Sequence, residues 1–222
     1  MRVSAPWKFH SKNFHLKIHL KEKINLKDHY EVKSNPYFEN DTDEILLTFS
    51  DCESTINEKD KIIYHEMIVK CKVNYKRKEY YYPIITFVDD AYSVIRGYYL
   101  GFEKCVSDIN MEKEHIQIHN KYFDLDFQLD KKEDVEKNDF VTYPFILIRD
   151  WKFDNEYVKK ELVSLIISDY KLVEKETFDI EMDEMKSLLK KIGIDKGLVY
   201  SIEKFYLEDE FILEGTEKID LD

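Results

Sequence analysis

Apolar and polar residues alternate along much of this chain, which is the pattern of a β-strand whose two faces differ. Every second residue of the segment 14–20 is Phe, Leu or Ile, and the residues between them are His or Lys. We therefore expect a strand there with one face in the core and the other in solvent. Further strands are predicted where β-branched and aromatic residues gather, at 45–49, 62–75, 80–88, 140–148 and 162–172, with a hairpin at 115–129 that turns near Asn120.

Two segments have the residue spacing of helices. Residues 91–100 follow Asp89 and Asp90, and an aspartate is a good N-cap. In residues 181–192 apolar side chains recur every three or four positions, and Gly193 is suited to end the helix. Two short helices against seven or more strands predict a mostly β (α+β) fold, built on an antiparallel sheet or barrel.

The composition supports a globular fold with one core. The chain has 222 residues, of which 43% are hydrophobic and 14% aromatic, and this excludes disorder over most of the length. The charged segment 131–139 is predicted to be a surface turn, so we expect a single domain over residues 1–222. No apolar run is long enough for a transmembrane helix, and residues 1–10 lack the apolar segment of a secretory signal.

Charge and cysteine content narrow the setting and the partners. The three cysteines form no C-x-x-C pair, which predicts a reducing, cytoplasmic location without a disulfide framework or a zinc knuckle. The formal net charge of −12 argues against nucleic acid or an anionic membrane as a partner, because both bind through a basic face. A small anionic metabolite can still bind where two or three cations converge.

The segment 95–106 contains the strongest candidate for chemistry. Gly97 and Gly101 precede Lys104, and two tyrosines and Phe102 are its aromatic neighbours. An apolar pocket would lower the pKa of this lysine because burial disfavours the charged amine, and only the neutral amine attacks a carbonyl to form a Schiff base. Spacing alone favours the simpler alternative, a solvated lysine on a turn.

Histidines and one cysteine offer other chemistry. His15 and His19 share a strand face, as do His115 and His119, and such pairs can bind a metal ion. No cysteine or carboxylate stands at a matching short spacing, so we expect solvated histidines and no metal site. Cys105 follows a lysine and could be a reactive thiol, but without a Cys-His-Asn pattern we expect a buried structural cysteine.

Several segments, in order along the chain, resemble the acetoacetate decarboxylase family. The sequence Pro-Trp-Lys-Phe-His at 6–10 and the alternating strand after it are similar to the family's opening. Residues 82–90 resemble its aromatic strand with an acidic turn, and residues 96–105 resemble its Gly-Arg-Glu helix and Gly-Phe-Pro-Lys-Lys loop. Residues 143–148 and 199–221 resemble later segments. The resemblance implies a closed or nearly closed antiparallel β-barrel with a few peripheral helices.

The resemblance also implies roles for individual residues. Lys104 falls on the family's Schiff-base lysine, and Glu66 falls on its active-site glutamate. Substrate-binding positions are implied for Lys12, Asp51, Phe102 and Arg96. Among these, Lys12 stands in place of a pocket arginine, and Asp51 stands near a second pocket carboxylate, where the family has glutamate.

Departures from the family pattern surround the candidate lysine. Cys105 stands where the family has a second lysine, Glu103 replaces a proline, and the order Arg96-Gly97 inverts the family's Gly-Arg. The cysteine removes a neighbouring cation, so desolvation alone would have to lower the pKa of Lys104. Glu103 would raise that pKa if its carboxylate pointed inward.

The function implied is a lyase that decarboxylates a small β-keto acid such as acetoacetate through an imine on Lys104. Glu66 would position the substrate or relay protons, aided by Asp51, and neither a metal nor an organic cofactor is needed. Two alternatives stay open: a relative that uses the same imine for aldol, dehydration or cyclisation chemistry on a keto acid, and a barrel that binds small acids without turnover. The family also implies a homo-oligomer.

Overall fold

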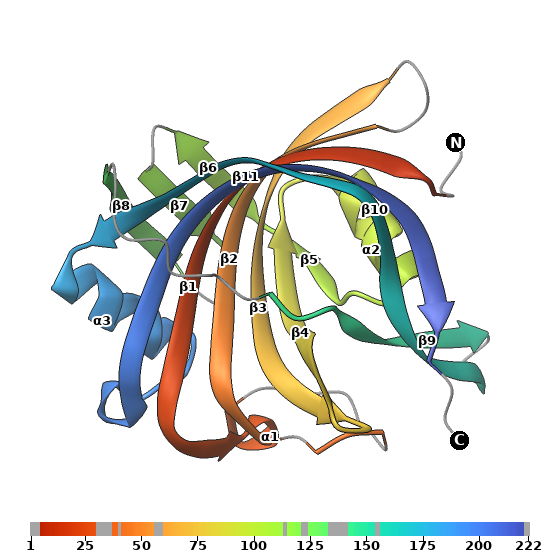
Figure 1. The fold of residues 1–222 in the computed structure, drawn as a ribbon, viewed down its shortest axis with the longest axis horizontal. Helices are drawn as coiled ribbons and strands as arrows, with labels where there is room; N and C mark the ends of the chain where they lie inside the picture. Colours follow the sequence, from red (N-terminus) through yellow and green to blue (C-terminus); the bar gives the residue numbers. More distant parts are fainter. Residues whose placement is uncertain are drawn as a thin grey trace.

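The computed structural model of the protein describes residues 5–29, 37–39, 41–55, 60–112, 115–120, 124–132, 142–153 and 156–219. Strands dominate this part of the chain (Figure 1), which confirms a mostly β (α+β) fold. The strands are β1 (Trp7–Asn25), β2 (Asp41–Thr55), β3 (Lys61–Tyr75), β4 (Lys78–Val88), β5 (Lys104–Val106), β6 (Asp108–Glu112), β7 (His115–His119), β8 (Asp124–Lys132), β9 (Ile146–Phe153), β10 (Glu156–Ile180) and β11 (Val199–Lys218). The helices are α1 (Leu26–His29), α2 (Ala91–Leu100), α3 (Met182–Lys191) and the 3-10 turn η1 (Lys196–Leu198).

The strands form one sheet in the order β5-β4-β3-β2-β1-β11-β10-β8-β7-β6, and β9 pairs with β10 beside this path. The ladder between β4 and β5 is parallel, and the ladders on either side of β1, β3 and β10 are antiparallel. β10 and β11 bend strongly and arch over the rest of the sheet (Figure 1). Among the described residues no ladder joins β5 to β6, so the sheet is open and the predicted closure into a barrel is not confirmed.

The central strands β1, β2 and β3 have two buried faces. One face consists of apolar side chains such as Leu16, Leu47 and Met67, which pack in the main hydrophobic cluster. The opposite face holds polar side chains, yet His15 is only 7% exposed and Thr48 only 4%. The predicted solvent face of the segment 14–20 is therefore wrong, because α2, β10, β11 and residues 142–145 line a cavity over it.

Each predicted strand has a counterpart, usually a longer one. The segments 62–75 and 80–88 match β3 and β4 closely, and Pro83 lies at a register shift between them. The hairpin at 115–129 appears as β7 and β8, although residues 121–123 of its turn lie outside the described residues. In the segment 140–148 the strand begins only at Ile146.

Three strands were not predicted, and one predicted turn is displaced. The additional strands are β5, β6 and β11. The charged turn predicted at 131–139 begins inside β8, which continues to Lys132, and residues 133–139 lie outside the described residues.

The two predicted helices are confirmed. α2 has the expected bounds, and Asp90 is its N-cap because its carboxylate accepts a hydrogen bond of 2.7 Å from the backbone N–H of Ser93. α3 occupies residues 182–191 of the predicted 181–192, and Gly193 follows with a φ of 76°. None of the helices in the described part of the chain has the length and hydrophobicity needed to cross a membrane.

Candidate functional site

A cavity of about 490 Å³ lies against the polar face of β1, β2 and β3. Its remaining walls come from α2, β10, β11 and residues 142–145, and much of the lining is apolar or aromatic. Polar side chains converge on it from separate elements; they include Asn13, His15, Ser50, Glu66, Lys70, Ser93, Arg96, Lys104 and Asp209. A mostly apolar cavity with a few convergent polar groups is the usual form of a small-molecule site.

Lys104 places its amine inside this cavity. Its side chain is 8% exposed, and Nζ donates hydrogen bonds to Oε2 of Glu66 at 2.7 Å and to Oγ of Ser93 at 3.0 Å. The rings of Tyr64 and Phe102 lie 5.7 Å and 5.6 Å from Nζ, within the range in which a ring face attracts a cation. The amine is thus held in one place between a carboxylate, a hydroxyl and two aromatic rings.

Helix α2 shapes the wall around Lys104. Its residues Ser93, Arg96 and Gly97 face the cavity, because Arg96 and Gly97 lie three and four positions after Ser93 and so fall on the same side of the helix. A Cβ at Gly97 would lie 2.5 Å from Cδ of Lys104, so the absence of a side chain there makes room for the lysine. Gly101 then ends the helix with a φ of 106°, a conformation that favours glycine, and Phe102 donates its N–H to the Gly97 carbonyl at 2.8 Å.

Arg96 stiffens the same wall. It is 3% exposed, and its Nη1 donates hydrogen bonds to Oγ of Ser54 at 2.8 Å and to the carbonyl of Thr55 at 3.3 Å. Its guanidinium lies 5.2–5.9 Å from the centroids of four rings, those of Trp7, Phe9, Tyr64 and Tyr92. Its Nη2 is buried without a hydrogen-bond partner among the described residues.

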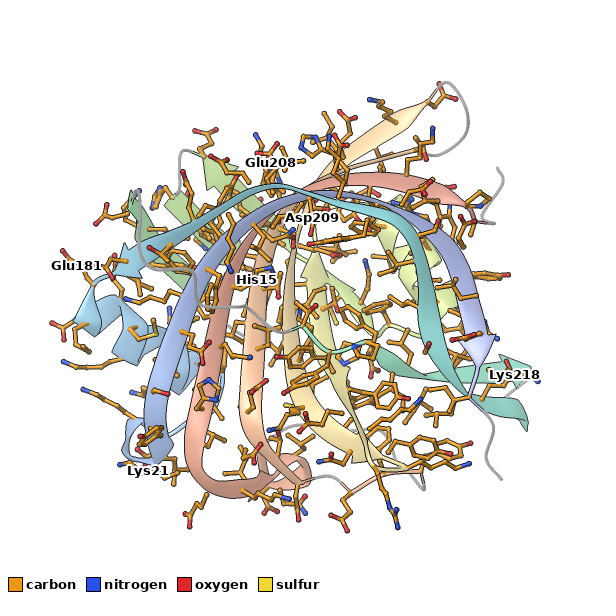
Figure 2. All side chains as sticks on the ribbon, viewed as in Figure 1. His15, Lys21, Glu181, Glu208, Asp209 and Lys218 are labelled. Carbon is orange, nitrogen blue, oxygen red and sulfur yellow. The ribbon has the colours of Figure 1, made fainter. Side chains whose placement is uncertain are left out.

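A polar row crosses the sheet beneath the cavity. Ser50 donates to Oδ1 of Asn13 at 2.7 Å, and Asn13 donates to Oδ1 of Asp209 at 3.4 Å. Figure 2 labels Asp209 on β11 and His15 on β1, both in the middle of the molecule. Burial raises the pKa of Asp209 to about 6, so this carboxylate becomes fully ionised only near neutral pH.

A second lysine, Lys70, and a histidine, His15, also line the cavity from the central strands. Burial lowers the pKa of Lys70 to about 7, and burial together with the charge of Lys70 lowers the pKa of His15. Oγ1 of Thr48 lies 3.0 Å from Nδ1 of His15. In the described part of the chain no three His, Cys, Asp or Glu side chains gather as a metal site would require.

Four of the six predicted site residues meet in this cavity, and two do not. Lys104, Glu66, Phe102 and Arg96 line it. Lys12 and Asp51 are opposite each other on β1 and β2, with their neighbours facing inward, so alternation turns both side chains away. Lys12 is exposed, and the side chain of Asp51 is 40% exposed at 3.9 Å from His65. The pocket roles predicted for these two residues are not supported.

The residues beside Lys104 also face elsewhere. Cys105 is partly buried against the main hydrophobic cluster on the opposite face of β5, and Glu103 is exposed. Neither side chain therefore lines the cavity that contains the Lys104 amine.

The paired histidines do not share one environment. His15 is buried in the cavity wall, which corrects the expectation of a solvated side chain. His19 contacts Glu203 at 2.5 Å and Glu44 at 3.6 Å. His115 lies 2.6 Å from Asp126, and His119 contacts Asp124.

Sequence inspection missed three residues of the site: Ser93, Lys70 and Asp209. Lys70 had a detectable signal, because apolar residues at 67, 69, 71 and 73 leave it on the same strand face as Glu66. Ser93 lies one helical turn before Gly97, so it too could have been assigned to the lysine's wall. Asp209 could not have been assigned to the site, because the strand that carries it, β11, was not predicted.

Comparison with known proteins identifies the fold. No protein-family model matches the sequence, and no curated protein matches it. Solved structures do match over nearly the whole chain. An acetoacetate decarboxylase-like enzyme from Sphingomonas wittichii RW1 has a TM-score of 0.72 and 14% identity, over 98% of this chain and 94% of that chain.

Two further structures agree with this match. The enduracididine biosynthesis enzyme MppR, complexed with pyruvate, has a TM-score of 0.69 and 10% identity, over 100% of this chain and 92% of that chain. Acetoacetate decarboxylase from Legionella pneumophila has a TM-score of 0.66 and 14% identity, over 98% of this chain and 88% of that chain. This chain therefore has the fold of the acetoacetate decarboxylase-like enzymes.

Proposed function

We propose that this protein is an imine-forming lyase that decarboxylates a small β-keto acid at Lys104. Lys104 supports the proposal most directly, because its amine lies inside a largely apolar cavity, 2.7 Å from a carboxylate that can receive its proton. A lysine on the surface can also contact a carboxylate, as Lys204 contacts Asp179, but it has no enclosed space for a ketone beside it. The fold shared with acetoacetate decarboxylase-like enzymes adds support.

Formation of the imine needs a neutral amine. Transfer of a proton from the Lys104 ammonium to Glu66 leaves a lone pair on Nζ, which attacks the ketone carbon. The resulting carbinolamine loses its hydroxyl as water, with a proton returned from Glu66, and gives a protonated imine. Ser93, at 3.0 Å from Nζ, keeps the nitrogen oriented toward the cavity during these steps.

The protonated imine then acts as an electron sink. The bond between the α-carbon and the carboxylate breaks, carbon dioxide leaves, and the electron pair forms an enamine on Lys104. A proton adds to the enamine carbon, and water hydrolyses the new imine to release the ketone and restore the amine. One keto acid anion and one proton thus give one ketone and one carbon dioxide.

A second candidate uses the same imine for aldol, dehydration or cyclisation chemistry on a keto acid. It is favoured by Cys105, which replaces the family's second lysine and packs away from the cavity, so the residue after Lys104 adds no cation beside the amine. It is also favoured by the similarity to MppR, whose structure was determined with pyruvate. A cavity that binds small acids without turnover is the remaining alternative.

Borohydride trapping tests the imine. Protein incubated with acetoacetate and sodium borohydride should acquire a stable adduct on Lys104, detected by mass spectrometry after proteolysis. Lys104→Met should abolish the adduct, whereas Lys12→Met, which removes an outward-facing lysine, should retain it. An unlabelled wild-type protein would exclude both enzymatic candidates. Trapping at Lys104 without release of carbon dioxide would exclude the decarboxylase and leave the second candidate.

A further inference from the structure

Lys70 is a second lysine in the wall of the same cavity, and the chemistry proposed for Lys104 does not use it. It lies on β3, four residues after Glu66 and on the same face, and it is 5% exposed. Nζ lies 5.3 Å from the centroid of the Phe145 ring. Among the described residues the amine has no hydrogen bond and no ion pair.

This isolation is unusual for a buried lysine, which normally requires a partner. Lys17, also buried, lies 3.9 Å from Glu44, and Lys104 contacts Glu66 at 2.7 Å. Glu66 and Asp209 are near enough to Lys70 to favour its charged form without contacting it. A ligand carboxylate that entered the cavity would supply the missing contact.

We propose that Lys70 binds a carboxylate that the substrate retains, and that the substrate is therefore a keto diacid. This inference rests on the imine proposed at Lys104, which would hold the ketone carbon. The carboxylate at Lys70 is a separate group of the same molecule. Ile68 lies between Glu66, the partner of Lys104, and Lys70 on the cavity face of β3, and its side chain would face the carbon chain between the two groups.

The chemistry of decarboxylation shows why this carboxylate is not the one that leaves. A leaving carboxylate loses its charge as it becomes carbon dioxide. An ion pair with Lys70 would stabilise the charged ground state more than the transition state, and it would slow the reaction. A carboxylate that stays on the substrate keeps its ion pair throughout, so the same contact orients the molecule without that cost.

Binding of a carboxylate at Lys70 should depend on pH. The pKa of Lys70 is lowered to about 7 by burial, so about half of the amines are neutral at pH 7 and must gain a proton to pair with an anion. The affinity should therefore fall about fivefold between pH 7 and pH 8, and about tenfold for each further pH unit.

The other titratable groups in the cavity do not reproduce this dependence above pH 7. Burial lowers the pKa of His15, which stays neutral, and Asp209, with a pKa near 6, is already ionised. The titratable groups that share the wall with Lys70 come from every surrounding element: Tyr64 and Glu66 on β3, His15 on β1, Cys52 on β2, Tyr81 on β4, Tyr143, Tyr170 on β10 and Asp209 on β11, with Arg96 and Lys104 on the α2 side. Burial raises the pKa of the Cys52 thiol and of each of these four tyrosines, so they stay neutral as well.

Glutarate tests the carboxylate site independently of Lys104, because it is a diacid without a ketone and cannot form an imine. Isothermal titration calorimetry in two buffers of different ionisation enthalpy should show net proton uptake at pH 8 and an affinity that falls about fivefold between pH 7 and pH 8. Lys70→Met should weaken binding at least tenfold. Lys70→Arg should bind without proton uptake, and Lys12→Met should behave as wild type. Equal binding by wild type and Lys70→Met would overturn the proposal.

A matched series of ketones tests the substrate class. Acetone, acetoacetate and 3-oxoglutarate present the same carbonyl with zero, one and two carboxylates. In wild type, half-maximal borohydride trapping of Lys104 should need at least tenfold less 3-oxoglutarate than acetoacetate. Lys70→Met should remove this advantage and leave trapping with acetone unchanged.

The outcomes separate this inference from the proposed imine. If acetone labels Lys104 but the preference for 3-oxoglutarate is the same in wild type and Lys70→Met, the role of Lys70 is overturned and the imine stands. If no ketone labels Lys104 while glutarate binding depends on Lys70, the keto diacid is overturned and only the carboxylate site remains.

Discussion

Gly97 allows the Lys104 side chain to lie where it does. Atoms Cδ and Cε of the lysine occupy the space that a Cβ at Gly97 would need, at 2.5 Å and 2.6 Å. Glycine inside a helix costs about 1 kcal/mol relative to alanine, so α2 loses some intrinsic stability at this position. In exchange, the methylene groups of Lys104 pack directly on the helix backbone.

Gly97→Ala should therefore reduce labelling of Lys104 while the protein stays folded. The new methyl group must displace Lys104 from Glu66, and we expect borohydride labelling with acetoacetate to fall at least tenfold. The folded protein should persist, because alanine favours the helix by about 1 kcal/mol and offsets part of the collision. Circular dichroism during thermal unfolding checks the second point.

Ile95→Ala is the matched control for that variant. Ile95 is 49% exposed on the same helix, so its truncation should leave labelling unchanged. Wild-type labelling of Gly97→Ala would mean that the contact between the glycine and the lysine does not position the amine.

At single positions, the sequence predicted which residues to consider better than the direction of their side chains. Lys104 and Glu66, taken from the resemblance, lie together in the cavity wall, and their catalytic roles stay predictions. Lys12 and Asp51 were assigned from the same resemblance, but in a strand the orientation of a side chain reverses at every residue, and both point away from the cavity. The alternation of residues 67–73 places Lys70 on the strand face of Glu66, but the sequence does not show that this face is buried or that the amine lacks a partner there.

Helix α2 is the element that assembles the site. It supplies the hydroxyl of Ser93, the packed guanidinium of Arg96 and the bare backbone of Gly97. Its first turn is fixed by Asp90, whose carboxylate accepts the N–H of Ser93. Ser93 therefore makes both contacts: its hydroxyl accepts a hydrogen bond from the Lys104 amine, and its backbone N–H donates one to the N-cap residue Asp90.

Asp90→Ala should lower the free energy of unfolding by about 1 kcal/mol, the usual cost of losing an N-cap. Urea unfolding followed by circular dichroism measures this change. Asp90→Ser preserves a capping oxygen and should restore most of the loss. Equal destabilisation by both variants would show that the carboxylate acts through something other than the cap.

Elements with local signals were predictable, and β11 was not. The start of α2 was predicted from the aspartates before it, and the end of α3 from Gly193, because both kinds of signal act within a few residues. β11 covers residues 199–218, where apolar and charged residues come in short groups rather than in alternation. Both of its faces are partly buried and Asp209 enters the cavity, so no period of two marks the strand.

Across the whole molecule, the central sheet separates a core from a cavity. Leu47 and Thr48 are neighbours on β2, and both are buried. Leu47 packs in the main hydrophobic cluster, and Thr48 lines the cavity beside His15. The two faces should therefore respond differently to substitution.

Leu47→Ala should destabilise the protein by about 2–5 kcal/mol, because it opens a void in a close-packed region. Thr48→Val keeps the side-chain volume and removes one hydrogen bond, so it should cost only about 1 kcal/mol. Chemical unfolding of both variants gives the comparison. Similar losses would indicate that the cavity face is packed as tightly as the core.

Closure of the sheet could not be predicted, because strand periodicity does not identify pairing partners. β1 pairs with β11, although the two strands lie near opposite ends of the sequence, with Trp7 opposite Leu213. Such pairings depend on contacts between distant segments, which local patterns do not encode. The resemblance implied a barrel, and the described strands instead end at β5 and β6 without joining.

The alternation of side chains in the central strands leaves two sets of positions free to diverge separately. Every second residue of these strands packs in the hydrophobic core, and the residues between them line the cavity. Substitutions at the cavity-lining positions could therefore change the chemistry of the cavity while the core residues keep the fold unchanged. Such a separation is consistent with a shared fold at low identity, as in the match to MppR, which covers the whole chain at 10% identity.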